Sequence, residues 1–95
     1  MRTMLVDVIE ARVLQGHRLS LRFADGVEGE VDLDTIVRWE GIFAPLSTPD
    51  RFAEVRVDPV LGTIVWPNGA DVDPDVLYAA VTGRSIDLPR AAAQR

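Results

Sequence analysis

The feature that most constrains the fold is a pair of neighbouring segments in which apolar and polar residues alternate. In "RLSLRFA", Leu19, Leu21 and Phe23 alternate with polar residues, and "VEGEVDL" (residues 27–33) repeats the pattern. A period of two places the apolar side chains on one face of a β-strand. The two segments are therefore predicted to be antiparallel strands, each with one buried face and one solvated face.

The short link between these strands fixes their register. Residues that pair across a hairpin must share a face, and a two-residue turn would place Phe23 opposite Glu28, which mixes core with solvent. A three-residue loop (24–26) pairs Phe23 with Val27 instead. This loop is a type I turn closed by a left-handed residue, and Gly26 tolerates that conformation.

The apolar patterns elsewhere predict three more strands and two short helices. Together they indicate an α+β fold: an antiparallel sheet of about five strands, in the order β-β-β-α-β-β-α, with the helices packed on it. We expect one domain over residues 1–88 and a frayed tail over 89–95. The remaining elements are a first strand over 4–13, a helix within 32–41, a loop with a one-turn helix at 48–50, strands within 53–66, and a helix over 74–82.

Two segments have patterns with less regular apolar spacing. In the first strand, Ile9, Ala11 and Val13 can join the core face, which leaves Val6 and Val8 pointing the other way. Either the strand carries a bulge or its second face is covered. In the loop after the first helix, the buried anchors are expected to be Ile42, Phe43, Leu46 and Phe52.

The stretch "WPNGADVDPDVLY" (66–78) concentrates unusual residues that a strand-to-helix junction explains. Pro67 ends the strand, and Asn68 with the glycine after it forms a turn. Asp73 is expected to cap the last helix, with proline in its first turn. The spaced aspartates do not match a calcium loop, whose sixth and twelfth positions require glycine and glutamate. Trp66 and Tyr78 are expected to pack in the core or at its edge, and not to form a stacking platform for bases.

Composition excludes several classes of function. The chain has no cysteine, so disulfides and thiolate chemistry are ruled out. Its first residues do not form a signal peptide, and no apolar run is long enough to span a membrane, so we expect a cytoplasmic protein. The net charge of −5 disfavours direct binding to nucleic acid and favours a basic partner.

The sequence contains no pattern of catalytic residues. His17 is the only histidine and is expected to be an exposed turn residue beside Gly16, and no serine lies in a nucleophile motif. We therefore expect no enzymatic activity, no cofactor and no metal.

The acidic residues after the hairpin loop are a candidate contact for a partner. Glu28 and Glu30 lie on the solvated strand face, and Asp34 follows the strand. The predicted register also places Arg22 opposite Glu28 and Arg18 opposite Asp32, so the alternative is a charged outer face with cross-strand pairs. A second candidate contact is the apolar pair Val6 and Val8, if they are exposed.

Several motifs resemble the bacterial family known as domain of unknown function 2442. They are "LRFADG", "VDL", "GIFAPLSTPDRFAEVRVD" and "GTIVWPNGADVDPDVLY", and the resemblance covers residues 4–82. It implies a small α+β domain without known enzymatic activity. It also implies a setting similar to toxin–antitoxin pairs, in which a small protein of the domain of unknown function 4160 family is the partner. Some relatives carry a helix-turn-helix domain after this one.

Two functional hypotheses follow. The first is a non-catalytic protein-binding domain, the antitoxin-like half of a pair, which masks a small basic partner; a homodimer is also possible. The alternative is an enzyme or ligand sensor that uses a pocket beside Trp66, Asn68 and Asp71.

Overall fold

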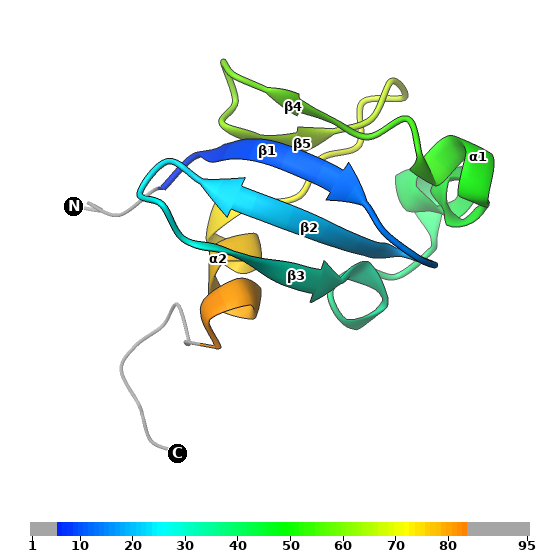
Figure 1. Cartoon of the computed structure of the whole chain (residues 1–95). Helices are drawn as coiled ribbons and strands as arrows, with labels where there is room; N and C mark the ends of the chain where they lie inside the picture. Colours follow the sequence, from blue (N-terminus) through cyan, green and yellow to red (C-terminus); the bar gives the residue numbers. More distant parts are fainter. Residues whose placement is uncertain (1–5, 84–95) are drawn as a thin grey trace.

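A computed structural model describes residues 6–83 of the chain (Figure 1). The expected tail at 89–95 lies outside the described residues. In chain order the elements are β1 (Val8–Val13), β2 (Arg18–Phe23), β3 (Glu28–Asp32), the 3-10 helices η1 (Leu33–Thr35) and η2 (Gly41–Ser47), α1 (Pro49–Phe52), β4 (Arg56–Asp58), β5 (Thr63–Val65) and α2 (Pro74–Thr82).

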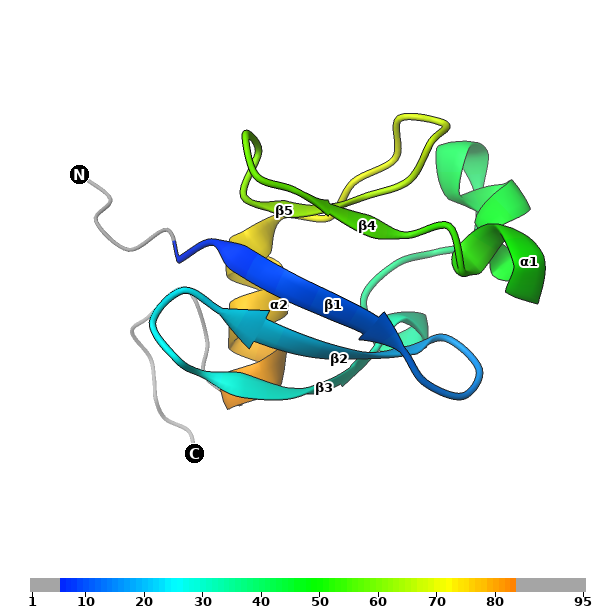
Figure 2. The ribbon, with the colours of Figure 1, turned by 45° about the horizontal axis from the view of Figure 1, so that its top comes forward.

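The predicted α+β class and the antiparallel pairing are confirmed, but the strands form two sheets instead of one. One sheet has the order β1-β2-β3, and β4 pairs only with β5. Figure 2 shows this two-stranded ribbon beside β1, with α2 on one face of the larger sheet. The N–H of Val8 donates to the carbonyl of Gly62 at 2.9 Å, which ties the ribbon to one end of β1.

The register of the first hairpin is as predicted. The N–H of Phe23 donates to the carbonyl of Val27 at 2.8 Å. Gly26 has φ of +93°, in the left-handed region. The Asp25 carboxylate accepts the N–H of Val27 at 3.0 Å and supports the turn.

A β-bulge resolves the uneven pattern of the first strand and corrects the prediction for two residues. The register shifts between Val8 and Glu10, so Val8 pairs with Phe23 while Ala11 pairs with Leu21. The extra residue is accommodated at the bulge. Val8 is therefore buried in the core, and Ile9, which was expected in the core, is exposed.

The core forms where the inner face of the larger sheet meets residues from the second half of the chain. Its largest fully buried side chains include Trp66, Phe23, Phe52 and Leu77. The Trp66 indole N–H donates to the carbonyl of Phe52 at 3.1 Å, which satisfies the polar end of a buried ring. The expectation that Trp66 packs in the core is confirmed.

The segment between the sheets is less helical than predicted. The expected helix within 32–41 is a single 3-10 turn, η1, capped by Asp32, whose carboxylate accepts the N–H of Asp34 at 3.0 Å. Gly41 begins the next 3-10 helix instead of ending the first. Leu46 and Phe52 are buried as expected, whereas Ile42 is exposed.

The last helix has the predicted bounds and the predicted caps. The Asp73 carboxylate accepts the N–H of Asp75 at 2.8 Å, and Gly83 ends the helix with φ of +75°. Leu77 is fully buried, whereas Ala80 is exposed. Tyr78 packs edge-on against Phe23 instead, with ring centroids 5.0 Å apart.

The Asp73 cap can be tested by its effect on stability. Asp73→Ala removes the acceptor for an N–H in the first turn, so we expect a loss of about 1 kcal/mol in the free energy of unfolding. Urea denaturation measures it. Asp71→Ala is the matched control, because it removes the same charge from an exposed aspartate that has no capping bond. Equal losses in the two variants would contradict the role of the cap.

Candidate functional site

The acidic face predicted on β3 is largely neutralised by arginines from β2. Glu28 and Glu30 are exposed, as expected. Arg22 lies 3.4 Å from Glu28, and Arg18 lies 3.2 Å from Glu30. Arg22 also approaches Glu10 of β1 at 3.8 Å. Such exposed pairs add little stability, but they reduce the negative field that the strand presents to a partner.

Asp34, the third predicted contact residue, has an internal role. One of its carboxylate oxygens accepts hydrogen bonds from His17 Nδ1 and from the indole N–H of Trp39, both at 2.9 Å. These donors, the Trp39 bond first, hold the pKa of Asp34 below its ordinary value of 3.8.

His17 is not the exposed turn residue that the sequence predicts. Its side chain is only 21% exposed, and its Nε2 donates to the carbonyl of Ser47 at 2.7 Å. Its ring lies 4.3 Å from that of Trp39 and 5.0 Å from that of Phe52. Both ring nitrogens already form hydrogen bonds. The Ser47 carbonyl lies against Nε2, at the position that a nucleophile would need if His17 were its general base. His17 therefore joins the β1–β2 turn to η2.

The residues of the alternative pocket do not converge on one cavity. Trp66 is buried and its indole N–H is already bonded. The Asn68 amide donates to the carbonyl of Ile42 at 2.9 Å, and its oxygen accepts the N–H of Ala70 at 3.0 Å. Asp71 is exposed and lies on a cleft of about 410 Å³ with Leu61 and residues near the start of α2.

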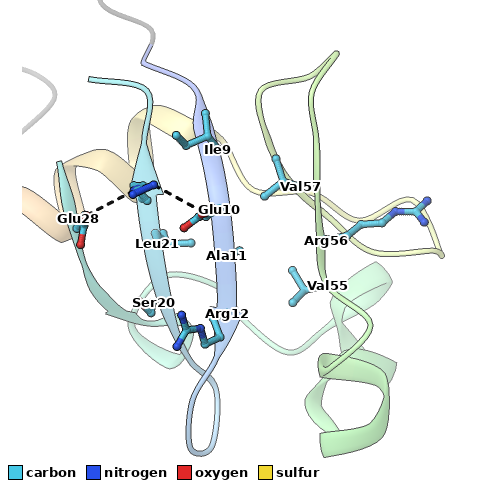
Figure 3. Close-up of a pocket in the computed structure, with 11 residues that line it drawn as sticks. Ile9, Glu10, Ala11, Arg12, Ser20, Leu21, Glu28, Val55, Arg56 and Val57 are labelled. Carbon is cyan, nitrogen blue, oxygen red and sulfur yellow. Dashed lines mark hydrogen bonds and ion pairs between the residues drawn. The ribbon is translucent and has the colours of Figure 1, made fainter. Parts of the chain in front are cut away.

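A larger groove lies between β1 and the segment that leads into β4 (Figure 3). Its volume is about 720 Å³. In Figure 3 the side chains of Val55 and Val57 point toward β1, where Ala11 and Ile9 lie. The groove therefore combines apolar walls with a polar rim on the outer face of the sheet. The remaining lining residues are Glu10, Arg12, Ser20, Leu21, Arg22, Glu28 and Arg56.

The strand edge along this groove is unpaired. The N–H of Leu14 donates to the carbonyl of Arg18. In an antiparallel pair of strands, hydrogen-bonded residue pairs alternate with residue pairs that are not hydrogen-bonded. With the observed register, Glu10 and Arg12 therefore bond to β2. The N–H and C=O groups of Ala11 and Val13 point to the other edge. Within residues 6–83, no strand pairs with that edge.

A second exposed apolar feature lies at the turn between β4 and β5. Val60 is 90% exposed and Leu61 is 54% exposed. Asp71 lines the same cleft as Leu61, and the Asp7 carboxylate lies against Gly62. Asp7 and Asp71 form no ion pair with the residues that the structure describes. We call Asp7, Val60, Leu61 and Asp71 the hairpin-tip patch.

The sequence profile of a known family matches residues 8–90, most of the chain. The chain belongs to the family of proteins of unknown function named DUF2442. This result confirms the resemblance seen in the sequence motifs. Among curated proteins, no sequence matches this one significantly.

This DUF2442 chain is also similar to a solved structure from Nitrosomonas europaea. That protein is named as a candidate DNA-binding protein. The two share 26% identity with a TM-score of 0.70, and the match covers 82% of this chain but 50% of the other. The DUF2442 chain thus spans half the length of that protein.

Across the described part of the DUF2442 chain, no three histidine, cysteine, aspartate or glutamate residues are grouped so that they could hold a metal ion. Within the same residues, no helix has the length and hydropathy needed to cross a membrane.

The bonds to Asp34 predict a defined pH dependence. A carboxyl group whose pKa is lower in the folded state stabilises the fold above its ordinary pKa, and this contribution is lost as pH falls through the folded value. Unfolding free energies measured from about pH 5 down to about pH 2 should therefore fall less steeply in Asp34→Asn than in the wild type. Asp71→Asn is the control, since no hydrogen bond to its side chain is found among the described residues. A slope for Asp34→Asn equal to that of the wild type would contradict the prediction.

Proposed function

We propose that the protein is a non-catalytic protein-binding domain, the antitoxin-like member of a cytoplasmic two-protein module that masks a small basic partner. The hairpin-tip patch carries this proposal. It offers two exposed aliphatic side chains and two exposed aspartates that form no ion pair with the described residues. An apolar centre with a charged rim is the usual anatomy of a protein interface.

The charges of the patch specify the kind of partner. Among residues 6–83, no arginine forms an ion pair with Asp7 or Asp71, in contrast to Glu28 and Glu30 on β3. Unpaired acidic groups attract a basic surface and increase the rate of association. A small basic protein, such as a member of the domain of unknown function 4160 family, would meet this requirement.

Direct binding to DNA is less well supported by this chain's chemistry. The name of the Nitrosomonas europaea protein suggests that activity, but the match covers only 50% of that protein. Affinity for DNA depends mainly on cationic contacts to phosphate, and this chain has a net charge of −5.

The polar side chains of His17 and Asn68 support the enzyme or ligand-sensor alternative less well than they support a non-catalytic domain. His17 and Asn68 have their side-chain polar atoms in hydrogen bonds within the fold. A binding pocket needs polar groups that converge on the ligand. Asp71 alone faces a cleft, and it is part of the hairpin-tip patch.

The aliphatic residues of the patch can be tested by capture and growth assays. The tagged wild-type protein, isolated from its own cells, should retain a small basic protein whose separate expression arrests growth. Val60→Ser with Leu61→Ser should lose the partner and fail to restore growth, because the interface loses its apolar centre. Ile42→Ser is the control, since Ile42 is 49% exposed at a distant position in sequence. Retention of the partner by the double variant would place the contact elsewhere.

The aspartates of the patch should act mainly on the association rate. Asp7→Asn with Asp71→Asn should slow association with the purified partner and flatten its dependence on salt, because screening then has fewer charges to act on. Stopped-flow measurements at two ionic strengths provide the test. The comparison variant is Glu28→Gln with Glu30→Gln. If that variant alone slows association, the acidic strand β3 is the contact.

A further inference from the structure

The hydrogen bonds of His17 require a proton on both of its ring nitrogens. Nδ1 lies 2.9 Å from a carboxylate oxygen of Asp34, and Nε2 lies 2.7 Å from the carbonyl oxygen of Ser47. An ionised carboxylate and a carbonyl oxygen only accept hydrogen bonds. A neutral imidazole has one N–H, so it could donate to only one of these two oxygens. Both bonds therefore form only when the ring is the positively charged imidazolium.

The surroundings of the ring favour this positive charge. The Asp34 oxygen that faces Nδ1 also accepts the indole N–H of Trp39 at 2.9 Å, so this oxygen is an acceptor and not a hydroxyl. The Trp39 ring lies 4.3 Å from the imidazole ring, a distance at which an aromatic face attracts a cation. The bond from Trp39, followed by the bond and the charge of His17, lowers the pKa of Asp34 and keeps its carboxylate ionised.

Asp34 is the only charged side chain that pairs with His17 within residues 6–83. The helix η2, which supplies the Ser47 carbonyl, has the sequence "GIFAPLS" and no titratable side chain. The other charged residues next to the groups around the ring are Arg18, Asp32, Arg38, Glu40, Asp50 and Arg51. None of them forms an ion pair with His17 in the described chain. The charge of the ring is therefore coupled to that of Asp34.

Two side chains from distant segments hold η2 by its carbonyl groups. Near the start of η2, the Asn68 amide donates to the carbonyl of Ile42, and at its end His17 donates to the carbonyl of Ser47. An amide does not titrate in the physiological range, whereas histidine exchanges a proton between about pH 5 and 8. The attachment at Ser47 is therefore the one of these two that responds to pH.

We propose that His17 is a pH-sensitive clamp that holds the end of η2 against the β1–β2 turn. In its protonated form the ring bridges Asp34 and Ser47. As pH rises, Nε2 gives up its proton to water, because Nδ1 is held by the charged carboxylate, which is the stronger acceptor. The bare Nε2 then faces a carbonyl oxygen that has no proton to donate, so the bond is lost and the Ser47 end of η2 is released. This inference does not rest on the hairpin-tip patch or on the proposed masking of a basic partner.

The two titrating groups bound the pH range in which the clamp is closed. Asp34 must be ionised, and its pKa lies below the ordinary value of 3.8. His17 must be protonated, so its contribution to stability is present at low pH and is lost as pH rises through the range of histidine, about pH 5 to 8. The clamp is therefore closed near pH 5 and open near pH 8.

The first test observes the ring directly by nitrogen NMR of the full-length protein. His17 is the only histidine, so its ring signals identify themselves. We expect both nitrogens to be protonated at about pH 5 and Nε2 alone to be bare at about pH 8. The amide signal of Thr48 should titrate together with the ring, because this N–H shares a peptide unit with the Ser47 carbonyl. The amide of Gly83, which donates to Ala79 in α2, is the internal control and should not follow the ring.

The second test compares stability at the two ends of this pH range. Between about pH 5 and 8 the equilibrium constant for urea unfolding should rise about fivefold in the wild type, as expected for one lost hydrogen bond. His17→Gln should lack this rise, because the glutamine amide does not titrate. Asn68→Ala is the matched control, since it removes the other side-chain bond to η2 and should keep the rise. Should His17→Gln fail to fold, the ring signals of the wild type decide the question.

The outcomes distinguish this proposal from the proposed function. The Val60→Ser, Leu61→Ser variant should keep the full response to pH, even if it loses its partner. The clamp is overturned if the folded protein has a bare ring nitrogen at about pH 5, or if Nδ1 loses its proton before Nε2. It is equally overturned if the Thr48 amide does not follow the ring, or if folded His17→Gln retains the response of the wild type.

Discussion

The structure depends on the burial of one face of β2. Leu19, Leu21 and Phe23 are each no more than 1% exposed, and they hold the inner face against Trp66 and the rest of the core. The geometry of a strand then determines which residues of β2 bond to each neighbouring strand and which side chains point outward. Its odd-numbered residues bond to β3 and its even-numbered residues bond to β1. The same alternation places Arg18 and Arg22 outward, where they neutralise glutamates, and directs part of the β1 backbone toward the groove.

The elements that could be predicted from sequence are those whose determinants lie within a few residues of one another. The register of the first hairpin follows from face parity around Gly26, and the bounds of α2 follow from Asp73 and Gly83. Each prediction rested on a local conformational requirement. For β1, the sequence predicts either a bulge or a strand whose second face is covered. The hydrophobic pattern does not reveal where an extra residue is inserted. This ambiguity reversed the assignments of Val8 and Ile9.

The features that sequence reasoning missed depend on contacts between distant segments. His17 reaches Asp34 and the Ser47 carbonyl, which lie 17 and 30 residues away. The residues next to His17 in the sequence, including Gly16, indicate only a turn. The Asn68 amide, named for the alternative pocket, likewise donates to the carbonyl of Ile42, which lies 26 residues away. No periodicity or cap motif encodes such pairs, and only the closed fold brings the partners together.

The separation of β4 and β5 from the larger sheet leaves the outer edge of β1 without a pairing strand among the described residues. A five-stranded sheet would have satisfied Ala11 and Val13 with an internal strand. The ribbon is instead tied to β1 at Val8 and Gly62, at the end of the strand. Beyond that point, β1 and β4 belong to different sheets with the groove between them. The ribbon nevertheless lies close to β1, with Cα atoms of β1 and β4 within 8 Å of each other, and so covers part of this edge. The same ribbon carries Val60 and Leu61 on its turn, so the proposed partner contact depends on how this hairpin is held beside β1.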